Sequence, residues 1–243
     1  MHRTTGLPGH ARGASLAGAW SVVFAVMLAW PAIAFAHVPI LEQTGRPDAR
    51  GTASTPFPSA QVIESPTKSL AIYGYLASDE DLDAYTFAVA AETSLTLEML
   101  VPARAGLADF RPTLTLLSSA ADQPIVLPDP GADPRASFYE PFSISDFYRG
   151  GSALVTLLPG RRYFLVVEPG SAARHDGAYT IGVSGGEQFT AGETWSTLLA
   201  LPTIWLGDWG GGPVRPGALV VLGVLAALLA AAALVTARRR HRR

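Results

Sequence analysis

The sequence predicts an all-β protein, an antiparallel β-sandwich or jelly roll, with an N-terminal signal helix before it and a C-terminal transmembrane helix after it. Three observations lead to this fold class. Short runs of β-forming residues fill much of the chain between residues 69 and 185, turn residues separate most of these runs, and a long apolar stretch lies near each end of the chain.

Each expected strand is an apolar or alternating run bounded by turn residues. In the run 94–101, for example, Leu95, Leu97, Met99 and Val101 fall on one face, as expected of a strand that is buried on one side. Roughly eight such strands suit a sandwich. The clearest runs are residues 69–76, 82–89, 94–101, 113–117, 153–158, 162–168 and 179–183.

Three segments break this pattern. Residues 37–68 contain five prolines and are expected to form an irregular leader. Within the domain 69–186, residues 119–150 are rich in proline and aromatic residues and predict a long inserted loop, which either packs on the sandwich or binds a ligand. Residues 187–216 predict a tryptophan-rich juxtamembrane segment, helical before Pro202, that lies on lipid or on the domain or completes the domain core.

Residues 1–36 have the features of a secretory signal peptide. Arg3 and Arg12 precede a largely apolar run, and Ala34-Phe35-Ala36 provides the small residues of a cleavage site just before His37. The alternative is an uncleaved N-terminal anchor. We expect cleavage, which leaves His37 as the first residue of the mature chain.

Residues 217–237 contain no charged side chain and are long enough to span a bilayer as a helix. Five arginines follow in residues 238–243, and such a cluster stays in the cytoplasm. The sequence therefore predicts a single-pass protein of the cell membrane whose domain faces the periplasm or the exterior. A tail removed by a sorting enzyme is the alternative, although no LPxTG-type motif is present.

Charge is sorted along the chain. All 20 acidic residues lie between Glu42 and Asp208, and the segment 37–216 contains Lys68 and ten arginines, a net charge of −9. A surface of this sign argues against nucleic acid as a partner. The chain has no cysteine, which excludes thiolate metal sites, cysteine nucleophiles and redox pairs.

Two motifs resemble a known family. The stretch Asp81-Leu-Asp83-Ala-Tyr85-Thr-Phe87, together with Gly177-Ala-Tyr179-Thr-Ile-Gly-Val183, resembles the bacterial pre-peptidase C-terminal domain, and residues 113–118 and 163–167 take the middle places in order. The likeness covers about residues 69–184. It implies a jelly-roll sandwich with an accessory or adhesion-like role, as in uncharacterised membrane-anchored bacterial proteins, and it implies no reaction. Residues 119–150 are longer than the corresponding part of that family.

Asp79, Asp81 and Asp83 form the densest acidic cluster. Ca²⁺ binds six to eight oxygen ligands, and domains of the resembling family sometimes bind calcium, so these residues are candidate calcium ligands. The alternative is a solvated turn whose carboxylates cap exposed amides. The spacing matches no EF-hand.

His37 is the second metal candidate. After signal cleavage, its free amine and imidazole could chelate Cu²⁺ together, and His175 is the second imidazole that the outer segment offers. The alternative is that His37 binds nothing in particular.

The sequence carries no catalytic motif: no G-x-S-x-G, H-E-x-x-H, phosphate-binding glycine loop or dinucleotide fingerprint occurs. We therefore expect a non-enzymatic, membrane-anchored module that binds an envelope protein or a carbohydrate, or that has a structural role. A periplasmic copper-binding protein and a calcium-stabilised accessory domain of a secreted or envelope complex are the alternatives.

Overall fold

The computed structural model describes residues 37–42, 57–120, 123–127, 129, 131, 135–170, 174–185, 191–206, 223, 224, 226, 227 and 231. The predicted signal peptide, the basic tail 238–243 and most of the predicted span 217–237 lie outside these residues. None of the helices in the described part is long and apolar enough to cross a membrane.

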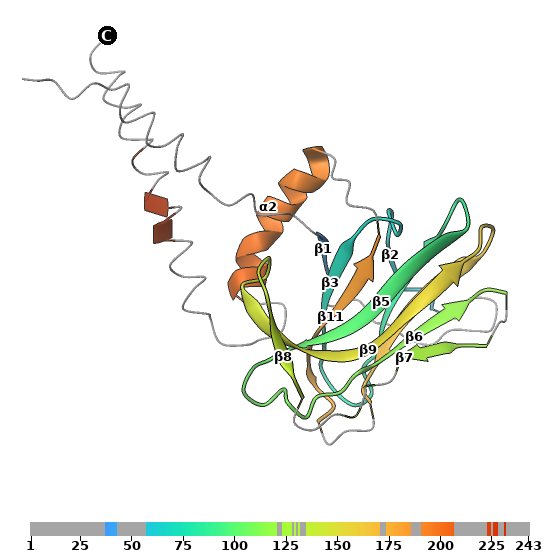
Figure 1. Cartoon of the computed structure of the whole chain (residues 1–243), viewed down its shortest axis with the longest axis horizontal. Coiled ribbons are helices and arrows are strands. Elements are labelled where there is room, and N and C mark those ends of the chain that lie inside the picture. Colours follow the sequence, from blue (N-terminus) through green and yellow to red (C-terminus); the bar gives the residue numbers. More distant parts are fainter. Residues whose placement is uncertain are drawn as a thin grey trace, which may run out of the picture. The chain divides into compact units, whose positions relative to one another are not determined.

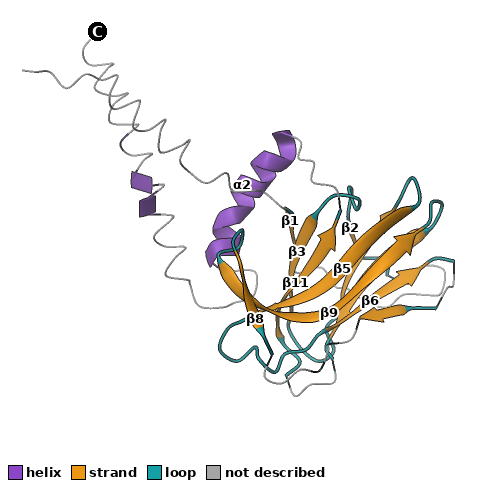
Figure 2. Cartoon of the chain, in the orientation of Figure 1, coloured by secondary structure: helices purple, strands orange, loops and turns teal. Residues whose placement is uncertain are grey.

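The described residues form two sheets that face each other, as Figures 1 and 2 show. The first sheet has the order β1-β3-β11-β5-β9-β8 and the second has the order β2-β4-β10-β6-β7. Their bounds are β1 Val38–Leu41, β2 Gln61–Val62, β3 Leu70–Leu76, β4 Asp83–Ala88, β5 Thr93–Pro102, β6 Thr113–Ser118, β7 Ile125–Leu127, β8 Ser137–Glu140, β9 Ser145–Leu157, β10 Arg162–Glu168 and β11 Gly177–Ser184.

The β-sandwich expected from the sequence is confirmed, and the strand order is that of a jelly roll. Successive strands β3, β4, β5 and β6 alternate between the sheets, and so do β9, β10 and β11. Four strands of each sheet make the roll, β3-β11-β5-β9 and β4-β10-β6-β7, while β1, β2 and β8 are added at sheet edges. The pairs are antiparallel except β1 with β3 and β2 with β4, which are parallel.

The prediction of an irregular leader over residues 37–68 is wrong in part, because β1 and β2 lie within it. Pro39 is tolerated in β1 because this strand is at a sheet edge, where one side of the strand needs no backbone donors. The Gln61 side chain of β2 donates a 3.1 Å hydrogen bond to the Leu41 carbonyl of β1. The two edge strands thereby link the sheets on one side of the sandwich.

The core lies between the sheets and is built from the alternating residues of both. Inward-facing side chains such as Ile72, Leu97 and Leu165 are almost completely buried. β10 is buried along its whole apolar run because both faces of its sheet are covered, and a second apolar cluster forms on the outer face. That cluster contains Phe57, Ala60, Leu82, Ala84, Phe164 and Val166.

The inserted loop predicted for residues 119–150 is also wrong in part, because it contains β7, β8 and the start of β9. The described part of this segment extends both sheets at their edges. β9 is 13 residues long and changes register against β5 near Gly150, whose missing Cβ leaves room for Met99. An added residue at such a bulge bends a strand, and glycine makes the close approach feasible.

Helix α2, Ala191–Leu206, covers part of the outer face of the first sheet and lies against β1 (Figure 1). Tyr73 of β3 and Thr180 of β11 are register partners, and both alternate with core residues, so they point away from the core. Each is nevertheless only 2% exposed, which means that the outer face of the sheet is covered at this place. On the helix, Leu201, Ile204 and Trp205 are buried. The described part of the predicted juxtamembrane segment therefore packs on the domain.

The expectation that this helix ends before Pro202 is wrong. Proline removes one helical hydrogen bond and disfavours the helical conformation of the preceding residue. Here the helix continues for one more turn, because Ile204 and Trp205 are buried in that turn and the Trp205 indole donates a 2.9 Å hydrogen bond to the Phe142 carbonyl. Tertiary packing thus offsets the local cost of proline.

Candidate functional site

A buried polar network joins the two motifs that carry the family resemblance. Tyr179 of β11 donates a 2.5 Å hydrogen bond from its hydroxyl to Asp83 of β4, and the Tyr85 hydroxyl lies 2.8 Å from the same Tyr179 oxygen. Asp83 is 3% exposed. Burial raises the pKa of Tyr179 well above its ordinary value, and the neighbouring Tyr85 and Asp83 act in the same direction. This network connects the two sheets through the core.

The three predicted calcium ligands lie in three different surroundings, and only Asp83 belongs to this network. Asp81 caps its own turn, because its carboxylate accepts hydrogen bonds from the backbone amides of Ala77 and Leu82. Asp83 faces the core, whereas Asp79 is exposed in the loop between β3 and β4. The three carboxylates do not converge. Among the described residues, no group of three or more His, Asp or Glu side chains could hold a metal ion.

The predicted copper ligands are also far apart. His37 lies beside the start of β3, where its Nδ1 is 2.6 Å from the Ser69 hydroxyl. His175 lies just before Gly177, the register partner of Leu76 at the opposite end of β3. Seven residues of strand are about 20 Å long, so the two imidazoles cannot share one ion in this structure. A copper site at His37 would have to use the amine and a ring nitrogen of this residue without His175.

The structure brings Asp79 and His175 together instead, in an open groove at one end of the sandwich. Three connections contribute to it: residues 77–82 between β3 and β4, residues 103–112 between β5 and β6, and residues 174–176 just before β11. Its volume is about 650 Å³. The groove is lined by Ala77, Ser78, Asp79, Gly106, Asp109, Arg174, His175 and Asp176. We call it the loop-end groove.

Arg174 holds two of these loops together. Its guanidinium donates to the carbonyl of Gly106 at 2.9 Å and pairs with the Asp176 carboxylate at 3.0 Å, and its backbone forms a bridge with Phe110. Phe110 is completely buried. Its ring packs directly against Gly177, where a Cβ would overlap the ring. The groove is thus fixed to the core, although it is made of loops.

The charge of the loop-end groove is negative. Arg174 is engaged with Asp176, and the groove in addition presents the exposed residues Asp79 and Asp109. Two further carboxylates beside one satisfied ion pair attract a cation, and a concave surface strengthens that field. His175, which is half-buried there, adds a group that accepts or donates a hydrogen bond.

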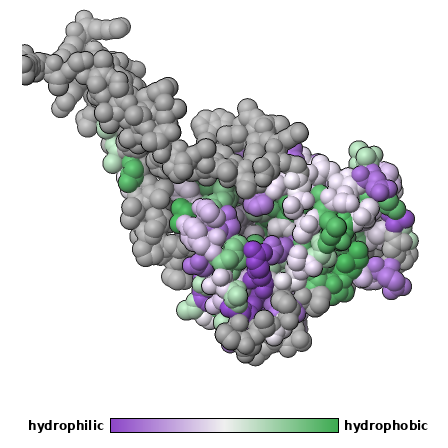
Figure 3. Space-filling model, in the orientation of Figure 1, coloured by the Kyte–Doolittle hydropathy of each residue, from purple (hydrophilic) through white to green (hydrophobic). Residues whose placement is uncertain are grey.

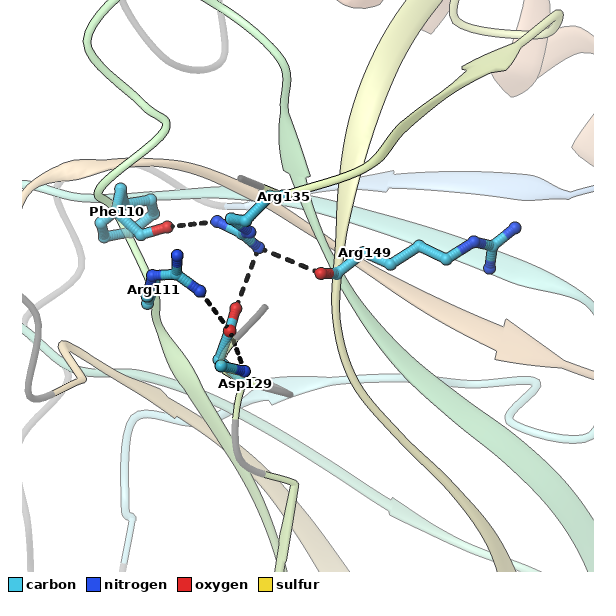
Figure 4. Close-up of polar contacts among 6 residues, drawn as sticks. Phe110, Arg111, Asp129, Arg135 and Arg149 are labelled. Atoms are coloured by element: carbon cyan, nitrogen blue, oxygen red, sulfur yellow. Dashed lines mark hydrogen bonds and ion pairs between the residues drawn. The ribbon is translucent and has the colours of Figure 1, made fainter. Parts of the chain in front are cut away.

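A second polar cluster lies in the segment 119–150 and has a structural role. Asp129 pairs with Arg111 at 2.5 Å and with Arg135 at 3.1 Å, as Figure 4 shows. Arg135 also donates to the carbonyl oxygens of Phe110 and Arg149, and its side chain is only 4% exposed. Burial lowers the pKa of Arg135, and the Asp129 carboxylate opposes this effect. The cluster joins three segments of the sandwich.

An ion pair between Arg111 and Glu140, the other pairing that the charged residues of this region allow, does not form, since Arg111 pairs with Asp129. Glu140 instead accepts hydrogen bonds from the backbone amides of Phe142 and Ser143, at 2.9 and 2.6 Å, and so caps the turn between β8 and β9. A carboxylate close to two backbone amides gains more from them than from a distant guanidinium.

Asp109 and Asp176 also line the groove, and the sequence alone does not single them out. Both lie in loops at the same end of the sandwich as Asp79. A signal existed, because alternate loops of a jelly roll share an end of the molecule. That signal can be used only when the strand order is known, which periodicity alone does not provide.

No protein-family model matches this chain, and neither does any curated protein. Among the solved structures that are similar to this chain are the following two. The pre-peptidase C-terminal domain of collagenase from Bacillus anthracis is 19% identical, with 51% of this chain and 94% of that chain covered and a TM-score of 0.35. PliG from Aeromonas hydrophila, a periplasmic inhibitor of g-type lysozyme, is 14% identical, with 60% and 96% covered and a TM-score of 0.26.

These likenesses are too distant to carry over a function or to define a family. The first structure is a domain of the family that the sequence motifs resemble, but a TM-score of 0.35 adds no argument to those motifs. The fold and the groove define a class on their own: a jelly-roll β-sandwich with an acidic groove at the end of its loops.

Proposed function

We propose that this chain is an extracytoplasmic β-sandwich module, anchored in the cell membrane by residues 217–237, that binds a partner without catalysing a reaction. The topology is supported by the sorting of charge along the sequence, because the five terminal arginines favour the cytoplasm while the segment 37–216 has a net charge of −9. The accessory role is what the resemblance to the pre-peptidase C-terminal domain implies.

The loop-end groove carries the binding part of this proposal. It is open, it is fixed to the core through Phe110 and Arg174, and it presents Asp79 and Asp109 beside a satisfied ion pair. The partner that fits this chemistry bears a positively charged group, such as a lysine or arginine side chain of an envelope protein. Binding of this kind is expected to be fast and sensitive to salt.

The binding test uses the full chain in lipid nanodiscs and a lysine-rich peptide as the probe. We expect the double variant Asp79→Asn, Asp109→Asn to bind the peptide at least tenfold more weakly. The control Glu92→Gln removes an exposed carboxylate from the turn between β4 and β5, at the opposite end of the sandwich, and should bind as the unaltered chain does. Equal affinities for all three proteins would contradict the proposed groove.

The topology test fuses reporters to the C-terminus. A fluorescent protein that matures only in the cytoplasm should be active after residue 243, and a phosphatase that is active only outside the cytoplasm should be inactive there. The opposite result would overturn the proposed orientation. Mass spectrometry of the purified protein checks the expected start of the mature chain at His37.

A further inference from the structure

The second half of β9 has a free edge on the side away from β5. β8 pairs with β9 only along Ser145–Tyr148, whereas β5 pairs with β9 as far as Leu157. In the part of the chain that the structure describes, no strand pairs with residues 152–157 on the side away from β5. The backbone N–H and C=O groups of such an edge have the spacing that another extended strand matches.

This edge has none of the features that usually keep two strands from pairing. Exposed edge strands ordinarily carry lysine or another charged residue, proline, or a bulge. Residues 150–158 read Gly-Gly-Ser-Ala-Leu-Val-Thr-Leu-Leu and contain neither a charged residue nor a proline. The bulge of β9 near Gly150 precedes the free stretch and does not interrupt it. Residues 152–157 therefore form a regular and uncharged edge.

Apolar side chains lie along this edge in both layers of the sandwich. Leu154 of β9 points away from the core and is 75% exposed. β7 is the edge strand of the other sheet and lies beside β9, and its Ile125 and Val126 are 43% and 52% exposed. Ile125 is the register partner of the core residue Leu116 and so points between the sheets, yet solvent reaches it. Figure 3 shows a hydrophobic area on the side of the visible face where β7 and the end of β9 lie.

A second copy of the chain matches this edge in both layers. Two β9 strands related by a twofold axis run antiparallel, and a register with Leu154 opposite Leu154 or opposite Thr156 keeps the core-facing residues of both copies on one side. Since β7 lies on the same side of the sandwich, the second sheets would also approach each other. Ile125 would then face apolar residues instead of water. A single extended peptide would pair with β9 alone and leave the β7 layer open.

The charges beyond the two ends of the free stretch also favour an antiparallel copy. After it, the turn between β9 and β10 leads to Arg161 and the exposed Arg162. Before it, β9 presents the exposed Asp146, and Arg149 is already paired with Glu98. In an antiparallel pair, the basic end of each copy lies toward the acidic residue of the other. This local attraction opposes the repulsion expected between two segments that each have a net charge of −9.

We propose that the chain forms a homodimer through residues 152–157, in which β9 of each copy pairs antiparallel with β9 of the other. The partner is a second copy of this chain. It is held by backbone hydrogen bonds between the two edges, with apolar contacts of Leu154 on one side and of Ile125 on the other. The inference goes beyond the proposed function, because it requires neither the loop-end groove nor the membrane anchor.

A charge substitution on the edge tests the dimer. Leu154→Glu places like charges close together across the twofold axis, which weakens strand pairing. Leu154 is 75% exposed, so this change should leave the fold of one copy intact. The matched control is Val62→Glu, because Val62 is 66% exposed on β2, the edge strand at the opposite side of the second sheet from β7.

The measurement is the protein mass of the full chain in mild detergent, obtained by light scattering during size-exclusion chromatography. We expect the unaltered chain and Val62→Glu to be dimers, and Leu154→Glu to associate at least tenfold more weakly. A monomeric unaltered chain would overturn the inference. A Leu154→Glu variant that dimerises as the unaltered chain does would also overturn it, since another surface or the predicted membrane helix would then hold the copies together.

The absence of cysteine from the chain allows a second test that leaves the edge uncharged. Leu154→Cys and Val62→Cys each introduce a single thiol, and a short bismaleimide joins two thiols only when they lie close together. We expect Leu154→Cys to yield crosslinked dimers of the full chain at least tenfold faster than Val62→Cys. Equal rates at the two positions would contradict the β9 pairing, whatever the outcome for Leu154→Glu.

Discussion

The Tyr179 hydroxyl donates a 2.5 Å hydrogen bond to Asp83 inside the sandwich, and this bond links strands of the two sheets. Both residues come from the two short motifs that resemble the pre-peptidase C-terminal domain, although 96 positions separate them in the chain. The acidic residue of the first motif and the tyrosine of the second are thus partners in one buried network. Their role in this chain is structural, because burial shields both from any ligand.

Replacing Tyr179 with Phe should destabilise the domain by about 1–3 kcal/mol, because Asp83 then loses a donor while it remains buried. Chemical denaturation of the two proteins measures this difference. The control Tyr139→Phe removes a hydroxyl from a side chain that is 56% exposed and should change the stability by less than about 0.5 kcal/mol. A Tyr179→Phe variant as stable as the unaltered chain would show that the network contributes nothing.

The raised pKa of Tyr179 predicts an alkaline loss of stability. Burial is the main cause of the shift. The unfolded chain releases the tyrosine proton near pH 10, whereas the folded protein retains it to higher pH. The stabilisation is therefore complete below about pH 10 and declines as the pH rises towards the folded pKa. Between about pH 9.5 and 11, Tyr179→Phe should lose less stability than the unaltered chain, as measured by urea denaturation; parallel losses would contradict the assignment.

Gly74 of β3 is the register partner of Tyr179, and a Cβ added to Gly74 would overlap the tyrosine ring. Gly74→Ala should therefore cost about 1–3 kcal/mol through overpacking. Gly182→Ala is a matched control in β11, because a Cβ there meets its nearest atoms at 3.8 Å, an ordinary contact. Thermal melting of the two variants checks the contrast, and equal melting temperatures would exclude the steric explanation.

The cluster around Asp129 predicts a large effect of one substitution and a small effect of another. Asp129→Asn leaves the buried Arg135 guanidinium without its carboxylate and should destabilise the domain by about 3–5 kcal/mol. Glu98→Gln breaks a pair with Arg149, whose side chain is 57% exposed, and should cost at most about 1 kcal/mol. Denaturation midpoints measure both. A small loss for Asp129→Asn would show that the cluster does not hold the segment to the sandwich.

Several of the central strands could be predicted from the local pattern of apolar and polar residues. The runs at 69–76, 82–89 and 94–101 were recognisable because each buried strand alternates or stays apolar over a few residues, and they correspond to β3, β4 and β5. The short strands β1 and β2 were missed because they are edge strands with few residues of their own to bury. Their pairing depends on neighbours that are distant in the sequence.

The sequence by itself determined the all-β class and the sorting of charge, because both follow from local periodicity and composition. Only the tertiary structure decided that Asp79 shares a groove with Asp109, Asp176 and His175, that Asp83 belongs to the core, and that the helix continues past Pro202. The physical reason is that each of these outcomes depends on which strands become neighbours. Strand order brings remote loops to one end of the sandwich, and burial against distant residues outweighs the local preference of a proline or an aspartate.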